Sequence, residues 1–169
     1  MSSIGDAREY LIGWVGALAS CKQFAYVLAH SFDLPVAVDA LIAARRRGVV
    51  VWVLLDKAQA TSGSSSHNLR VIAQRRTALG VRVRLYKSRR LRATALLTDL
   101  ELLLGSASWT VESQSSVEQG ATLRLFDAAR REQESLFKEL WKEAAKDWNA
   151  GSEPSRGASR PSSAPASSP

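Results

Sequence analysis

The residues best suited to chemistry lie in one short segment of the chain, between positions 92 and 108. Arg92 and Thr94 are separated by a single residue, Asp99 follows them, and Ser106 and Ser108 stand near the end of the segment. A guanidinium group and hydroxyl groups can donate hydrogen bonds to an anion such as a phosphate. Arg92 cannot serve as a nucleophile, because its guanidinium stays protonated and offers no lone pair. The segment therefore predicts a site that can hold an anion but lacks an obvious group to attack it.

Two histidines are the remaining candidates for a reactive group. His30 ends an apolar run suited to a buried strand, close to the sheet edge where the sites of α/β proteins gather. His67 follows a Ser-rich stretch. Each can also be a plain polar residue of a loop or strand end, so His30 stands as an alternative reactive group. Cys21 is the only cysteine and the histidines show no ligand spacing, so the sequence predicts no disulfide, no metal site and no cofactor.

The charge of the chain favours anionic partners. Its formal net charge is +7, from 23 Lys and Arg against 16 Asp and Glu. Six basic residues fall within 11 positions that lead into the segment described above: Arg82, Arg84, Lys87, Arg89, Arg90 and Arg92. Arg82 and Arg84 alternate along a predicted strand and share a face, which suits the phosphates of nucleic acid or anionic lipid. The alternative is a solvated strand edge that resists aggregation, and the sequence leaves both open.

Apolar periodicity and turn signals predict an α/β fold. The expected helices cover residues 6–20, 35–47, 67–79 and 127–148, and the expected strands cover 24–29, 49–55, 81–86, 93–98, 101–104 and 121–126. The strand–helix–strand unit over residues 24–55 favours parallel pairing. The strands at 93–98 and 101–104 are joined by a tight turn and must be antiparallel. The result is a mixed sheet flanked by helices.

The chain has the length of one domain with a composition change near its end. We expect an N-terminal helix within residues 1–22 that packs on the domain, the domain itself over residues 23–149, and a disordered tail rich in Ser and Pro over residues 150–169. No apolar run is long enough for a transmembrane helix, and no clear targeting signal is present. The default expectation is a cytoplasmic protein.

The segment resembles the signature of the phospholipase D superfamily, with its reactive residues replaced. That signature reads His-x-Lys-x4-Asp and continues, about six residues later, with Gly-Ser-x-Asn. Asp99 and Ser106 match it together with the intervening Gly105, whereas the His and Lys positions hold Arg92 and Thr94, and the interval before Gly105 is one residue short. Ser108 occupies the Asn position.

The resemblance extends over roughly residues 20–145. The opening unit of the family is similar to a series of segments in this chain: a Phe-Asp-Leu-Pro stretch, a helix, an Arg-Arg-Gly sequence and a strand that ends at Asp56. The stretch at 116–119 stands where members carry an Asn-x-Glu-Asn element, of which Glu118 is retained. The resemblance implies one half of a phospholipase D-like fold, with the mitochondrial cardiolipin hydrolase and short endonucleases as the members most similar in layout.

The resemblance also implies the chemistry of the site. In the family, two motifs meet, one His attacks the phosphodiester phosphorus and the other protonates the leaving oxygen, while Lys and Asn hold the phosphate oxygens. A chain with one motif needs a partner chain, so a homodimer is expected. The catalytic positions of the signature are occupied here by Arg92, Thr94 and Asp99. The resemblance implies that Asp99 would orient the catalytic imidazole. The substrate-binding candidates are Ser106, Ser108, Glu118, Arg82 and Arg84.

Three functions follow from this pattern. The leading one is a pseudoenzyme of phosphodiesterase ancestry that is impaired because Arg92 and Thr94 replace His and Lys, and that binds phospholipid or nucleic-acid phosphates. The second is an active phosphodiesterase completed by a partner chain or by His30. The third is a non-enzymatic anion-binding or interaction module. In each case Thr94 and Ser106 should lie near each other at the centre of the sheet.

Overall fold

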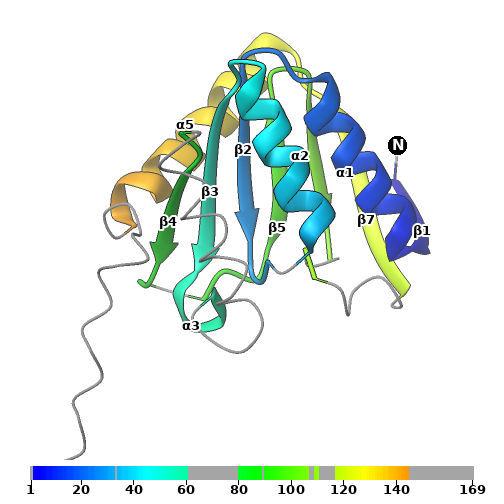
Figure 1. The fold of residues 1–169 in the computed structure, drawn as a ribbon, viewed down its shortest axis with the longest axis horizontal. Coiled ribbons are helices and arrows are strands. Elements are labelled where there is room, and N and C mark those ends of the chain that lie inside the picture. The colour runs from blue at the N-terminus through cyan, green and yellow to red at the C-terminus, as the bar shows by residue number, and fades with distance from the viewer. Residues whose placement is uncertain are drawn as a thin grey trace, which may run out of the picture.

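A computed structural model describes residues 2–32, 34–60, 80–88, 90–106, 109–110 and 117–144 of the 169-residue chain. Its centre is one seven-stranded mixed sheet (Figure 1). The strands, in spatial order, are β1 (Ser2–Asp6), β7 (Val117–Arg124), β6 (Glu101–Gly105), β5 (Thr94–Thr98), β2 (Phe24–Ala29), β3 (Val50–Asp56) and β4 (Arg82–Tyr86). The three strands β2, β3 and β4 are parallel, and every other pairing is antiparallel.

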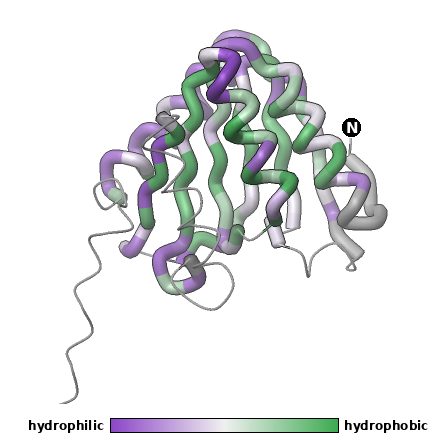
Figure 2. Tube along the Cα trace, viewed as in Figure 1, coloured by the Kyte–Doolittle hydropathy of each residue, from purple (hydrophilic) through white to green (hydrophobic). Residues whose placement is uncertain are grey.

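Helices cover both faces of this sheet. On one face, α1 (Ala7–Ser20) and α2 (Pro35–Arg46) pack side by side, and on the other face α5 (Asp127–Glu143) lies across the β2–β4 side (Figure 1). The short helix α3 (Lys57–Ala60) directly follows β3. The central strands are buried on both faces and are mostly hydrophobic along their length (Figure 2), as expected for strands between two helical layers. The predicted mixed α/β sheet flanked by helices is confirmed.

The local signals at the two ends of α2 explain why the chain returns into β3 parallel to β2. Pro35 is the first residue of α2, where its missing N–H costs nothing and its fixed φ suits the helix. Two arginines occupy the last turn, and Gly48 follows with φ of +91°, a conformation that favours glycine. This stop sends the chain straight back into β3, parallel to β2.

The core divides into two layers: a mainly aliphatic one under α1 and α2, which also holds Trp14, Phe32 and Trp109, and an aromatic one under α5. In the aromatic layer, Tyr26 stacks on Phe137 with ring centroids 4.9 Å apart, and Trp52 stacks on Trp141 at 4.8 Å. Offset ring pairs of this kind add about 0.5–1.5 kcal/mol each beyond the area they bury. They fix α5 against β2 and β3.

The predicted helices and strands match the described ones closely. The structure adds two elements, and two predicted ranges lie outside the described residues. β1 was not predicted, and it makes the first residues of the chain part of the sheet through pairing with β7. The predicted loop after β3 begins with α3. The predicted helix over residues 67–79 and the tail over 150–169 lie outside the described residues. None of the helices within the described ranges has the length and apolar character needed to cross a bilayer.

Candidate phosphate site at the motif edge

The motif residues gather at one edge of the sheet, which we call the motif edge. It is the edge at which the parallel strands β2, β3 and β4 end, β5 begins and β6 ends. Thr94 pairs with Gly105 across the antiparallel β5–β6 hairpin, which brings the two halves of the motif together. The carboxyl ends of parallel strands are the usual location of ligand sites in α/β proteins.

A shallow cavity of 410 Å³ lies over this hairpin. Thr94, Ser106 and Gln119 contribute polar groups to its wall. The Ser106 hydroxyl accepts a hydrogen bond from the Gln119 N–H at 3.0 Å, and the Ser106 N–H donates to the Gln119 carbonyl at 2.9 Å. These bonds fix Ser106 although its side chain is exposed, whereas Thr94 is 2% exposed. Thr94 and Ser106 both line this cavity, but strand alternation turns their side chains to opposite faces of the sheet, because the cross-strand partner of Thr94 is Gly105 and Ser106 is the next residue. The prediction that the two residues come together at the centre of the sheet is therefore not confirmed.

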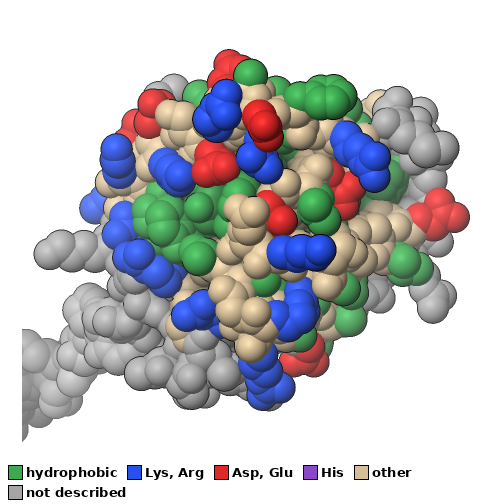
Figure 3. Space-filling view, turned by 90° about the horizontal axis from the view of Figure 1, so that it is seen from above, with side chains coloured by type: hydrophobic (Ala, Val, Ile, Leu, Met, Phe, Trp, Pro, Cys, Tyr) green, Lys and Arg blue, Asp and Glu red, His purple; other side chains and the backbone are tan. Residues whose placement is uncertain are grey.

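Cationic side chains lie along the connection between β4 and β5, which leads into this cavity at Ala93 and Thr94. Lys87, Arg90 and Arg92 are all exposed, and none of them pairs with another side chain in the part of the chain that the structure describes. Lys57, at the start of α3, lines a pocket together with Lys87 and Arg90 of this connection. The opposite end of the molecule instead carries intermingled basic and acidic side chains (Figure 3). The described part of the β4–β5 connection thus carries positive charge with no acidic side chain within it.

His30 also lies at the motif edge. β2 runs antiparallel to β5 with Leu28 opposite Ala95, so His30, two residues further along the chain, comes beside the residues that precede β5. Its ring Nδ1 lies 2.9 Å from the Leu91 carbonyl oxygen. A carbonyl oxygen can only accept, so Nδ1 carries the proton in this contact, and in a neutral ring Nε2 keeps its lone pair. The residue noted as an alternative reactive group is thus held in a defined tautomer.

A buried carboxylate positions the connection that carries these cations. Asp56, at the end of β3, is 2% exposed and accepts a hydrogen bond from the Leu91 N–H at 2.8 Å. Its other oxygen accepts from the N–H groups of Ala58 and Gln59 at 2.9 and 3.2 Å. Asp56 therefore ties α3 to the β4–β5 connection. The sequence indicates this role only through the position of Asp56, which is the first polar residue after an apolar strand.

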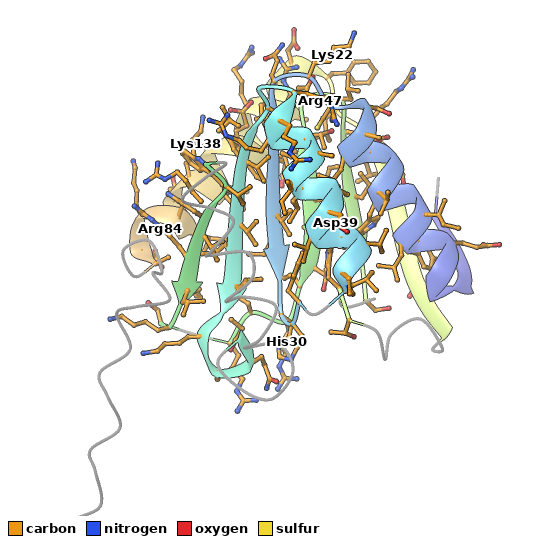
Figure 4. All side chains as sticks on the ribbon, viewed as in Figure 1. Lys22, His30, Asp39, Arg47, Arg84 and Lys138 are labelled. Atoms are coloured by element: carbon orange, nitrogen blue, oxygen red, sulfur yellow. The ribbon has the colours of Figure 1, made fainter. Side chains whose placement is uncertain are left out.

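Asp99 does not belong to the site, contrary to the expectation that it would orient a group there. It follows Thr98 at the far end of β5, and five residues of strand, about 16 Å, separate it from Thr94. Its carboxylate accepts hydrogen bonds from the N–H groups of Lys22 and Gln23 at 3.0 and 3.2 Å. Lys22 and His30 mark the two opposite ends of the molecule (Figure 4). The structure gives Asp99 the role of fixing the turn between α1 and β2.

Arg82 and Arg84 are also absent from the motif edge, although β4 alternates as predicted, with Arg82 exposed and Arg84 half-buried on one face. Arg84 donates to the Trp141 carbonyl oxygen at 2.6 Å, and its guanidinium lies 4.7 Å from the centre of the Trp141 ring. Arg82 lies 5.6 Å from the ring centre of Trp52. Cations over aromatic faces contribute about 0.5–2 kcal/mol, depending on how far they are desolvated. These two arginines hold α5 on β4, so the six-residue basic cluster divides into two unrelated parts.

The remaining predicted residues lie outside what the structure describes. Ser108, Arg89 and His67 fall in undescribed segments, and Glu118 is on β7 without a described side chain. Trp109 is described and fully buried, with its ring stacked on Phe32 at 5.3 Å, so it is a packing residue. Within the described ranges no group of three His, Cys, Asp or Glu side chains is arranged to hold a metal ion.

Comparison with known proteins identifies the family. The sequence model described as "Cardiolipin synthase, PLD-like domain" matches residues 15–148. The chain belongs to this phospholipase D-like family. No curated protein matches it.

Solved structures agree with this membership. Nuc from Salmonella typhimurium, described as a phospholipase D family member, superposes with a TM-score of 0.78 at 20% identity over 89% of this chain and 99% of that chain. NucT from Helicobacter pylori gives 0.74 at 15% identity over 86% of this chain and 98% of that chain. TrmBL2, described as an archaeal chromatin protein with a novel mode of DNA binding, gives 0.62 at 15% identity over 86% of this chain and 54% of its own. At these identities the structures establish a shared fold, and they confirm the expected phospholipase D-like architecture.

Proposed function

We propose that this phospholipase D-like domain binds phosphate groups at the motif edge without hydrolysing them. The observation that carries the proposal is the pair of substitutions at the β5 entrance, where Arg92 and Thr94 stand in the family positions of the nucleophilic His and the phosphate-binding Lys. Arg92 supplies a permanent positive charge with forked donors that suit phosphate oxygens. Ser106 adds a fixed hydroxyl close by.

The loss of catalysis follows from the same substitutions. A phosphohistidine cannot form at Arg92, because a guanidinium has no lone pair to donate to phosphorus. Thr94 brings no charge to stabilise the transition state, and its hydroxyl belongs to a nearly buried residue. Groups that act as one catalytic unit lose most of their effect when one of them is removed, so the residual rate should be very low.

Hydrolysis of bis(4-nitrophenyl) phosphate tests this proposal. The parent should show no turnover above background, and any turnover that scales with parent concentration contradicts the proposal. An Arg92→His, Thr94→Lys double variant restores the family residues, and turnover in this variant alone supports it. Thr94 is nearly buried, so the thermal unfolding of the double variant must be compared with that of the parent before its activity is interpreted.

A second candidate function rests on the geometry of His30. With Nδ1 held by the Leu91 carbonyl oxygen, the Nε2 lone pair of a neutral ring is available as a nucleophile or base at the motif edge. On this account the chain is an active phosphodiesterase whose imidazole comes from β2 instead of β5. Activity of the parent that disappears in both His30→Ala and His30→Gln variants would establish it. Activity that survives in both variants would exclude His30.

We further propose that two copies pair through the face of the sheet that α5 leaves open. Leu102 packs in the aromatic layer under α5, and Leu104 and Leu123 share its face by strand alternation and cross-strand pairing. They are 39% and 41% exposed. Paired copies would bring two Arg92 side chains toward each other, which a bound phosphate or Glu118 could neutralise.

Sedimentation analysis tests the pairing. The parent should sediment as a dimer in phosphate buffer, and a Leu104→Glu, Leu123→Glu variant should be monomeric. Ile12→Glu is the matched control, because Ile12 is 65% exposed on α1, on the other side of the sheet. A parent that is monomeric at about 100 µM, both with and without phosphate, refutes the pairing.

A further inference from the structure

We infer that the pocket on the β3–β4 side of the motif edge is a second phosphate subsite, so the domain binds the backbone of single-stranded nucleic acid. This inference rests on the proposed phosphate binding at Arg92 and extends it to a ligand with consecutive phosphates. The pocket has a volume of 520 Å³ and lies between the start of α3 and the β4–β5 connection. Its lining residues are Asp56, Lys57, Ala58, Tyr86, Lys87, Ser88 and Arg90.

The charges of this pocket favour an anion. Lys57, Lys87 and Arg90 contribute three cations, against the single carboxylate of Asp56. That carboxylate is 2% exposed and already accepts three backbone N–H bonds, so a ligand does not meet it as a free acceptor. Its role is to hold the cation-bearing segments in place. Ser88 adds a hydroxyl that can donate to a phosphate oxygen.

The spacing between this pocket and Arg92 suits neighbouring phosphates. Arg90 lines the pocket, and Arg92 stands two residues further along, at the entrance to β5. Two residues of extended chain span about 7 Å, comparable to the step between successive phosphates of an extended single strand. A ligand with one phosphate would occupy only one of the two positions. A polynucleotide backbone can occupy both.

The character of the pocket favours a soluble polyanion over a membrane surface. Its one aromatic residue, Tyr86, is 3% exposed and donates its hydroxyl to a Glu143 carboxylate oxygen at 2.9 Å. None of the residues that line the pocket is an exposed large hydrophobic side chain. Insertion into a bilayer interface needs such side chains, whereas tracking of a nucleic-acid backbone needs a basic groove. With no exposed ring for base stacking, binding should be independent of base sequence.

Fluorescence anisotropy with a labelled dT12 oligonucleotide tests the inference. If Lys57, Lys87, Arg90 and Arg92 each contact a phosphate, the log–log slope of affinity against salt should be about −2.8, at about −0.7 per contact for a single strand. A Lys87→Gln, Arg90→Gln variant should reduce the slope to about −1.4. The matched control is Arg131→Gln, Lys142→Gln, which removes two exposed cations from α5. The control should keep the parent slope.

The arms of the experiment separate failure of the pocket from failure of the proposed function. If the Lys87→Gln, Arg90→Gln variant keeps the parent slope, or if its slope decreases no more than that of the control, the pocket is not a phosphate subsite. If Arg92→Gln still reduces the slope in that case, phosphate binding at the motif edge stands without the second subsite. Binding to vesicles of anionic phospholipid, without binding to dT12, also overturns the inference. A variant is interpreted only if its thermal unfolding matches that of the parent.

Discussion

Substitution of Asp99 by Ala should destabilise the fold and leave phosphate binding intact. The carboxylate accepts hydrogen bonds from two backbone N–H groups, those of Lys22 and Gln23, and Asp99 is 8% exposed. A hydrogen bond to a charged group contributes about 1.5–3 kcal/mol. Water can partly replace the carboxylate at the surface turn, so we expect the free energy of unfolding to fall by about 2–4 kcal/mol. For a domain of this size, that change lowers Tm by roughly 5–15 °C.

Urea unfolding followed by tryptophan fluorescence measures the change, and dT12 anisotropy measures binding on the same preparation. The midpoint should fall with an unchanged m value, because the surface exposed on unfolding stays the same. Glu132→Ala is the matched control, since Glu132 is an exposed carboxylate on α5, and it should shift stability by no more than about 0.5 kcal/mol. An Asp99→Ala variant with parental stability and weakened binding would show that Asp99 acts in the site.

Three further results follow from the packing and the ionisable groups. Trp109→Ala should cost about 3–5 kcal/mol of unfolding free energy, because the ring is fully buried. Trp109→Phe should cost much less in the same assay, since no described residue accepts a hydrogen bond from the indole N–H. Arg84→Gln should lower the free energy of unfolding by about 1–3 kcal/mol and change the near-UV circular dichroism, because the contact with Trp141 is removed. Burial raises the pKa of both the Cys21 thiol and the Tyr26 phenol. The folded state therefore keeps protons that the unfolded state releases. The free energy of unfolding, measured by urea titration, should fall as pH rises above about 8.5. Cys21→Ala should remove the part of this fall that begins at the lower pH, because the thiol titrates before the phenol.

The fold was largely predictable because its strongest signals are local. β2 and β3 are continuous apolar runs, which suit strands buried on both faces. The stop signals after α2 and the tight turn between β5 and β6 set the parallel and antiparallel pairings. β1 was missed because Ser2–Asp6 is short and has no alternating pattern, and it joins the sheet through pairing with β7.

The site was only partly predictable because family position does not specify spatial neighbours. Alternation correctly placed Arg82 and Arg84 on one face of β4, but nothing local indicated that α5 would cover that face. For Asp99 the signal was present, since it follows a five-residue strand that begins at Thr94, and this already implies opposite ends of the sheet. The tautomer of His30 depends on a carbonyl 61 residues away in the chain, which no pattern in the sequence reveals.

The most direct test of the central claim is a single-turnover experiment with end-labelled dT12 and protein in excess. It follows bound and cleaved oligonucleotide in the same sample over several hours. The parent should bind the oligonucleotide and leave it intact, because the motif edge offers Arg92 and Ser106 to a phosphate and no catalytic His on β5. Cleavage that scales with protein and is lost in His30→Ala would contradict the claim in favour of a His30 enzyme. Absence of binding at about 50 mM salt would contradict it as well.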